Sequence, residues 1–189
     1  MRYEPPPLEV FLTRLAFRFY GKSVYRAYAN RLPLRGDERV LDFGSGLGTV
    51  AAYVAPRLPK GQLVCADVSA RWLAACRKTL RGYPGVAFYR GDAYGLPLAN
   101  GSFDLVYCHF VLHDIPREEM EKVIPALAAL LKEGGGLAFR EPLDREEPLR
   151  LIQRLLEENG LARQDSRVTD VPVMGNSLES LYRKERGWS

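Results

Sequence analysis

Cysteine and histidine are scarce in this sequence of 189 residues, and no long apolar run is present. The three cysteines, Cys65, Cys76 and Cys108, are odd in number and widely spaced. This spacing indicates neither a zinc knuckle nor a paired redox motif. We therefore expect free thiols that are mostly buried, as is usual for unpaired cysteine, and no bound metal.

No segment is typical of a membrane span or a secretion signal. The apolar stretch from Ile124 to Leu131 is too short to cross a bilayer. The apolar residues between Leu8 and Tyr20 are interrupted by Arg14 and Arg18, and no small-residue cleavage site follows them. We therefore expect a cytoplasmic protein without a membrane span.

The charge is nearly balanced overall but unevenly distributed. The net charge is +4, and residues 1–35 hold seven Lys or Arg against only Glu4 and Glu9. Such a segment can bind an anionic partner or a lipid surface, or it can be an ordinary solvated helix face. It lacks a dense Lys/Arg run, so binding to nucleic acid is disfavoured.

Apolar periodicity predicts an N-terminal helical segment followed by alternating strands and helices. Residues 8–31 have helical spacing, and Gly21 is expected to break them into two helices. Strands are predicted at residues 39–43, 62–67, 86–91, 103–110 and 136–140, with two more within 162–183. Helices are predicted at 47–57, 70–80, 118–131 and 148–158. This alternation is typical of one α/β domain with a mostly parallel sheet and helices on both faces.

Ligands of such sheets bind beyond the carboxyl ends of the strands, which indicates the loops 42–48, 67–72, 91–97 and 107–116. The first of these is Asp42-Phe43-Gly44-Ser45-Gly46-Leu47-Gly48. Its glycines permit positive φ and close approach of a ligand, and the following helix N-terminus favours a carboxylate. Thr49 stands where a dinucleotide fingerprint needs Gly or Ala, so a nicotinamide oxidoreductase is disfavoured.

Three acids lie near the ends of consecutive strands. Asp42 would pair with an ammonium group, Asp67 can accept both hydroxyls of a ribose, and Asp92 can accept from an exocyclic adenine amine. Asp67 could instead cap the 70–80 helix, although Ser69 already offers a cap, and Asp92 could be an ordinary loop residue. The three acids together favour a ligand that contains an amino acid, a ribose and an adenine.

The ordered segments resemble class I S-adenosylmethionine-dependent methyltransferases. The resemblance is carried by VLDFGSGLG, CADVS, GDAYGLPLANGSFDLVYCHFVLHDIP and LKEGGGLAFREP, and it runs from about Arg35 to Glu185. It looks closest to the small-molecule branch that includes quinone-biosynthesis C-methyltransferases. The resemblance implies a Rossmann-like, seven-stranded, mostly parallel sheet. It also implies S-adenosyl-L-methionine as cofactor and S-adenosyl-L-homocysteine as product.

The resemblance also implies a role for individual positions. Asp42 would help to hold the methionine ammonium, Asp67 the ribose diol and Asp92 the adenine amine. The remaining cofactor residues lie along the methionyl part and ribose or beside the adenine: Gly44, Ser45, Gly46, Gly48, Val68, Ala93 and Cys108. We add Tyr20 to the cofactor site, and we assign Tyr25, His109 and His113 to the acceptor pocket.

Methyl transfer requires alignment of donor and acceptor, and a general base only if the acceptor must lose a proton. His109 and His113, the only two histidines, both follow the fourth predicted strand. His109 is the candidate base. His113 is better explained as a structural hydrogen-bonding residue at the start of a loop.

Little chain is available for a lid after the fifth strand, so residues 1–35 are predicted to form a helical lid on a methyltransferase domain of residues 36–189. Its aromatic residues, which could wall the pocket or simply pack on the sheet, are Phe17, Phe19, Tyr20, Tyr25 and Tyr28. Such a lid suits a small hydrophobic or planar acceptor. The Asn-Pro-Pro-Tyr motif is absent after the fourth strand, which argues against nucleobase or glutamine amines.

Two other functions stay open. The chain could bind S-adenosylmethionine without catalysis, as a module or as a subunit of a methylating complex. RNA methylation, with the basic N-terminal segment on phosphates, is the less favoured alternative. The sequence decides neither the acceptor, nor the atom that is methylated, nor the oligomeric state.

Overall fold

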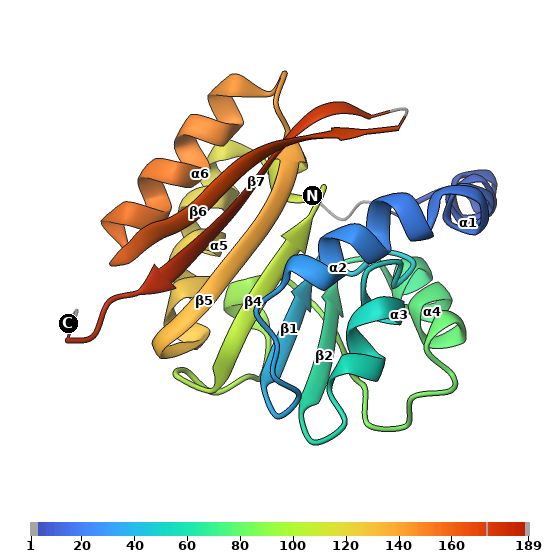
Figure 1. Ribbon diagram of the computed structural model, residues 1–189, viewed down its shortest axis with the longest axis horizontal. Coiled ribbons are helices and arrows are strands. Elements are labelled where there is room, and N and C mark those ends of the chain that lie inside the picture. Colours follow the sequence, from blue (N-terminus) through green and yellow to red (C-terminus); the bar gives the residue numbers. More distant parts are fainter. Residues whose placement is uncertain (1–3, 173, 188–189) are drawn as a thin grey trace. The chain divides into compact units, whose positions relative to one another are not determined.

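The structure is a computed structural model that describes residues 4–172 and 174–187 (Figure 1). The chain divides into two compact units, Met1–Asp92 and Ala93–Ser189. The described residues form seven strands, in the spatial order β3-β2-β1 in the first unit and β4-β5-β7-β6 in the second. Within the described part of the chain, no helix is long and apolar enough to cross a membrane.

The first unit contains the predicted parallel strands. They are β1 (Arg39–Phe43), β2 (Gln62–Asp67) and β3 (Ala87–Arg90). The register places Asp42 beside Cys65, and Asp67 beside Arg90 at the carboxyl end of the neighbouring strand. Helix α4 (Ala70–Thr79) follows β2, and its first turn is capped by the Ser69 hydroxyl, which accepts from the Trp72 N–H. These strands and this cap confirm the prediction.

The N-terminal helical segment is divided at Gly21. Helix α1 (Pro7–Tyr20), a π-helical stretch (Lys22–Arg26) and α2 (Ala27–Arg31) follow one another, and Gly21 keeps right-handed helical angles. The predicted division at Gly21 is therefore found, although the chain does not leave the right-handed helical region there. A Cβ atom at Gly21 would lie 2.4 Å from the Phe17 carbonyl oxygen and 3.0 Å from the Tyr53 hydroxyl. Glycine therefore permits close packing at this position.

The helix after the glycine loop is shorter than predicted. Helix α3 covers only Ala51–Val54 and continues as a short 3-10 turn to Arg57. Gly46 and Gly48 have φ values of 49° and 77°, in the left-handed region. A right-handed helix does not contain such residues, so α3 begins only after the loop has ended.

The second unit contains one parallel and two antiparallel strand pairings. Its strands are β4 (Phe103–His109), β5 (Leu131–Pro142), β6 (Leu161–Val171) and β7 (Gly175–Lys184), and its helices are α5 (Arg117–Leu130) and α6 (Glu146–Glu158). Strand β5 begins earlier than predicted, because the glycines at 134–136 lie inside it. A Cβ atom at Gly135 would lie 2.9 Å from the Lys132 carbonyl oxygen, at an irregularity in the β4–β5 pairing.

Each unit buries its own apolar residues. In α6 the buried side chains recur at helical spacing, as Leu149, Ile152 and Leu156. The three cysteines are free and buried, as expected. A hydrogen bond to Cys76, together with burial, raises the pKa of the Cys65 thiol. Seven mostly parallel strands with helices confirm the α/β fold, while the division into a lid and a domain at residue 35 stays a prediction.

Gly48→Ala should destabilise the protein more than Gly101→Ala. Both glycines have positive φ, which costs an alanine about 1–2 kcal/mol. A Cβ at Gly48 would also lie 2.8 Å from the Cys76 sulfur, whereas a Cβ at Gly101 meets no atom within 4 Å. We expect Gly48→Ala to lose roughly 1–3 kcal/mol beyond the control, measured by urea unfolding. Equal losses would contradict the steric account of the loop.

Candidate functional site

The Asp67 side chain joins the glycine loop to the start of α4. One carboxylate oxygen accepts the Gly46 N–H at 2.9 Å, and the other accepts the Ser69 N–H at 2.9 Å. The loop is held further by the Gly44 and Ser45 N–H groups, which donate to the Ala66 carbonyl. The end of β2 therefore fixes both the loop after β1 and the first turn of α4.

The environment of Asp67 acts on its carboxylate in two opposite directions. Burial raises the pKa of Asp67, and the nearby Glu4 charge raises it further, while the N–H groups of Ser69 and Gly46 oppose the shift. The Val68 N–H also acts on this carboxylate, so three backbone N–H groups use part of its roughly four acceptor directions. The carboxylate can therefore accept further hydrogen bonds from a ligand that carries hydroxyl groups.

The loop also leaves unused capacity at Ser45 and Gly46. The Ser45 hydroxyl is buried, and the described residues offer it no hydrogen-bond partner. A Cβ atom added at Gly46 would meet nothing within 4 Å in the described structure. An unpaired buried hydroxyl costs free energy, so a ligand that supplies its partner would bind favourably here.

The other predicted cofactor residues of the first unit lie at strand ends. Asp42 is buried in β1, Val68 is half-buried directly after β2, and Asp92 is exposed after β3. Tyr20 is exposed at the end of α1, and Tyr25 is half-buried in the π-helical stretch. Only Asp67 and the glycine loop are shown in direct contact, so the roles of these five residues stay predictions.

Sequence reasoning missed Glu4, which attaches the N-terminal segment beside Asp67. Its carboxylate accepts from the Ser69 hydroxyl at 2.7 Å and from the N–H groups of Ala70 and Arg71. It also pairs with Arg90 at 3.2 Å. The hydrogen bond from Ser69 is the main cause that lowers the pKa of Glu4. A carboxylate at a helix N-terminus is electrostatically favourable, but no local pattern indicates a partner 65 residues away.

In the second unit, Glu141 at the end of β5 holds the loop that follows β4. Its fully buried carboxylate accepts the N–H groups of Val111, Leu112 and His113 at 2.8–3.3 Å, and it lies 2.5 Å from the His113 Nδ1 atom. Phe110 at the start of this loop has a φ of 54°, which is unusual for a residue with a side chain. The prediction also missed Glu141, because the predicted strand ended at residue 140 whereas β5 continues to Pro142.

His109 is engaged by a buried ion pair. Arg140 pairs with Glu179 at 2.5 Å, and a second guanidinium nitrogen lies 3.2 Å from the His109 Nε2 atom. Because arginine only donates, Nε2 is the acceptor and the hydrogen of the neutral ring is on Nδ1. Burial and the charge of Arg140 hold the pKa of His109 well below its usual range.

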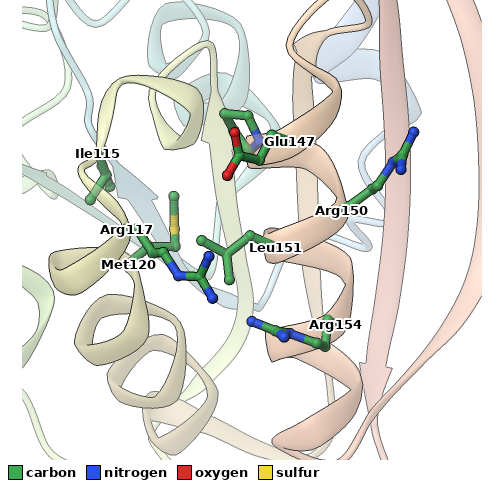
Figure 2. Close-up of a pocket in the computed structure, with 8 residues that line it drawn as sticks. Ile115, Arg117, Met120, Glu147, Arg150, Leu151 and Arg154 are labelled. Carbon is green, nitrogen blue, oxygen red and sulfur yellow. The ribbon is translucent and has the colours of Figure 1, made fainter.

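Two further predicted residues of the second unit are buried. Ala93 begins a short 3-10 turn, and Cys108 lies near the end of β4. Their contacts with a cofactor stay predictions, as does the role of His109 as a base. A cavity of about 400 Å³ lies between α5 and α6, and Arg117, Glu147, Leu151 and other residues line it (Figure 2). None of the predicted site residues lines this cavity.

The chain matches a family model described as a methyltransferase domain over residues 40–135, about half of its length. It belongs to this family. The resemblance seen in the sequence is thereby confirmed as that to class I S-adenosylmethionine-dependent methyltransferases. The matched residues include all of β1 except its first residue, together with the glycine loop, β2 and β4.

Two similar proteins are named as methyltransferases that act on different acceptors. Trans-aconitate 2-methyltransferase of Variovorax paradoxus is 35% identical over 146 residues, which are 71% of this chain and 54% of that protein. Demethylmenaquinone methyltransferase of Clavibacter sepedonicus is 31% identical over 156 residues, 82% of this chain and 61% of that protein. The chain thus spans about half to three fifths of the length of these relatives.

Solved structures share the fold of most of the chain. An S-adenosylmethionine-dependent methyltransferase from Aquifex aeolicus has a TM-score of 0.76 at 18% identity, covering 94% of this chain and 99% of that one. An N-methyltransferase from Bradyrhizobium japonicum in complex with S-adenosyl-L-homocysteine has a TM-score of 0.72 at 17% identity, covering 87% of each chain. The predicted Rossmann-like fold is therefore confirmed.

The glycine loop and Asp67 fit S-adenosylmethionine, the cofactor of the family. The partnerless hydroxyl of Ser45 and the open space at Gly46 can receive the methionyl part. The remaining acceptor capacity of Asp67 can receive the ribose hydroxyls. The hydrogen-bonding groups of these three residues therefore agree with S-adenosylmethionine as the ligand.

His113→Asn should change how stability depends on pH. Burial acts to lower the pKa of His113, but the hydrogen bond and charge of Glu141 and the charge of Asp114 outweigh it, so the pKa is raised. A His with a raised folded pKa stabilises fully below its unfolded value of 6.5 and loses this contribution as the pH rises through the folded value. In urea unfolding, the free energy of unfolding of wild type should exceed that of the variant most at about pH 5.5 and least at about pH 8.5.

His109→Asn provides the contrast, because the pKa of His109 is shifted down whereas that of His113 is shifted up. As the pH falls below 6.5, His109 should lower the free energy of unfolding of wild type relative to that of the variant. A stability difference between wild type and His113→Asn that is independent of pH would contradict the His113–Glu141 assignment.

Proposed function

We propose that this chain is an enzyme that transfers a methyl group from S-adenosylmethionine to a small hydrophobic or planar acceptor. The observation that carries the proposal is the Asp67 carboxylate, which is tied to Gly46 and Ser69 and keeps acceptor capacity for a ribose. Membership of the methyltransferase family supports it. A cytoplasmic location belongs to the same proposal, since three free buried thiols suit a reducing compartment.

When bound, S-adenosylmethionine supplies a methyl group that is already activated by its sulfonium. The residues of the chain therefore bind and orient. Asp67 would hold the ribose hydroxyls, the loop from Gly44 to Gly48 would hold the methionyl part, and Asp42 would pair with its ammonium. Alignment of this kind can lower a barrier by roughly 7–11 kcal/mol in favourable cases.

Proton transfer would be secondary in this site. The low pKa of His109 keeps its ring uncharged, which is the state that a base requires. Its Nε2 atom already accepts from Arg140, however, so this contact would have to open before the atom took a proton. His113 is held by Glu141 and acts in positioning the loop. We therefore propose that a proton lost by the acceptor leaves to solvent unless the contact between His109 and Arg140 opens.

The inner aromatic residues of the N-terminal segment support the choice of acceptor. The Phe17 ring lies edge-on to Tyr25 at 5.7 Å and to Tyr53 of α3 at 6.0 Å between centroids. Tyr28 is buried in the core and offers no open face, whereas Tyr20 is exposed. We propose that Tyr20 and Tyr25 form the acceptor wall of a lid, which suits a flat apolar molecule better than a sugar.

Asp67→Ala should weaken binding of S-adenosylhomocysteine by roughly 1–3 kcal/mol, because the ribose hydroxyls lose their acceptor. Ser45→Ala should weaken binding by roughly 1 kcal/mol. It should leave the free energy of unfolding unchanged or slightly higher, because the hydroxyl has no partner among the described residues. Isothermal titration measures both affinities. Asp144→Ala, an exposed acid, is the control and should bind as wild type does.

If Asp67→Ala bound S-adenosylhomocysteine as tightly as the control, Asp67 would have no place in the cofactor site. Thermal shifts with NAD and NADP complete the comparison. Ligand at 100 times its dissociation constant stabilises by about 2.7 kcal/mol. A stabilisation by a nicotinamide cofactor, and not by S-adenosylmethionine, would overturn the assignment.

Methyl transfer should favour an apolar planar probe over an acidic one. The two probes are demethylmenaquinone and trans-aconitate, the acceptors in the names of the relatives. Labelled cofactor should transfer its methyl to a ring carbon of the first probe, supplied in its reduced quinol form, and the hydrogen of that carbon leaves to solvent as a proton. Tyr25→Ala should raise the KM for this probe roughly tenfold through lost aromatic contact, whereas Tyr83→Ala should not. Preference for trans-aconitate would contradict the aromatic lid.

A further inference from the structure

Helix α1 is apolar on two opposite sides. On the inner side, Phe17 packs against Tyr25 and Tyr53. At the start of the helix, Glu4 is bonded to the first turn of α4, and the Pro5 carbonyl accepts from the Arg71 guanidinium. The helix is therefore fastened to its unit at both ends, and its other side stays directed away from these contacts.

The outer side of α1 carries a stripe of exposed apolar side chains. They follow one another at three- and four-residue spacing, with 41–71% of their surface exposed, and are Leu8, Phe11, Leu12, Leu15 and Phe19. We call these five residues the outer stripe. Residues at this spacing share one face of a helix. A contiguous apolar face of this kind on a folded chain marks an interaction surface.

Two arginines border the outer stripe. Arg14 and Arg18 are exposed and follow Phe11 and Leu15 by three residues, which makes each pair neighbours on the helix surface. Glu9 is the one acid of α1, and it is partly covered. The helix thus combines an apolar face with positive charge along its edge. Arginine at such an edge can reach phosphate groups while its stem lies along apolar surface.

We propose that α1 binds the surface of an anionic membrane, with the outer stripe in the lipid interface and Arg14 and Arg18 on lipid phosphates. An amphipathic helix of this composition lies in the interface without crossing it. This is consistent with the lack of a membrane-crossing helix in the described residues. A second copy of the chain fits less well, because α1 offers no row of carboxylates to meet its own arginines. The proposal does not depend on methyl transfer.

The test is sedimentation of the full chain with two kinds of vesicle, phosphatidylcholine alone and phosphatidylcholine mixed with phosphatidylglycerol. Wild type should bind the mixed vesicles, and salt should weaken this binding. Phe11→Ser with Phe19→Ser should weaken it by roughly tenfold or more. Arg14→Gln with Arg18→Gln should weaken it by roughly fivefold for each charge removed.

Matched controls come from exposed residues of the second unit. Val168→Ser with Met174→Ser removes apolar surface, and Arg150→Gln with Arg154→Gln removes two charges. Both double variants should bind the mixed vesicles as wild type does. Leu8→Ser with Leu12→Ser is a second variant of the outer stripe. It replaces Phe11→Ser with Phe19→Ser if circular dichroism shows that the first double variant is unfolded.

Three outcomes would overturn the proposal. The first is that wild type does not bind the mixed vesicles, and the second is that the controls lose as much binding as the α1 variants. The third is a dimer in sedimentation equilibrium that Phe11→Ser with Phe19→Ser dissociates, which would assign the outer stripe to a second copy. Titration with S-adenosylhomocysteine runs in parallel. Unchanged cofactor binding in the α1 variants separates this test from that of the proposed function.

Discussion

The two hydrogen bonds of the Asp67 carboxylate are the constraint on which the candidate site depends. They tie the end of β2 to Gly46 in the loop after β1 and to Ser69 at the start of α4. The same region holds the left-handed glycines of the loop, the late start of α3 and the Ser69 cap of α4. Glu4 then attaches the N-terminal segment to the same turn of α4, which brings the predicted lid to the residue proposed to bind the ribose.

The second unit uses a buried carboxylate in the same way. Glu141 at the end of β5 holds three successive N–H groups after β4, together with the ring of His113. Beside it, Arg140 joins Glu179 to His109. Buried charges are costly unless they are paired and hydrogen-bonded. These partners hold the loop after β4 through several hydrogen bonds at once.

The sequence predicted the strands well because short apolar runs and the residues between them are local signals. Residues 39–43 and 62–67 match β1 and β2 without a shift. The prediction missed the roles of residues that depend on a contact with a distant part of the chain, because no local sequence pattern indicates such contacts. Gly21 is needed for its approach to Tyr53, and Glu4 reaches a helix 65 residues further along the chain. Arg140, a charge at the end of the predicted strand 136–140, was the one signal that could have been followed further.

The central claim is that Asp67 and the glycine loop together bind S-adenosylmethionine. A crystal structure of the chain with S-adenosylhomocysteine tests it most directly. The account predicts both ribose hydroxyls within hydrogen-bond distance of the Asp67 carboxylate, and the Ser45 hydroxyl bonded to the methionyl part. Density for the ligand in the cavity between α5 and α6, with Asp67 free of it, would contradict the account.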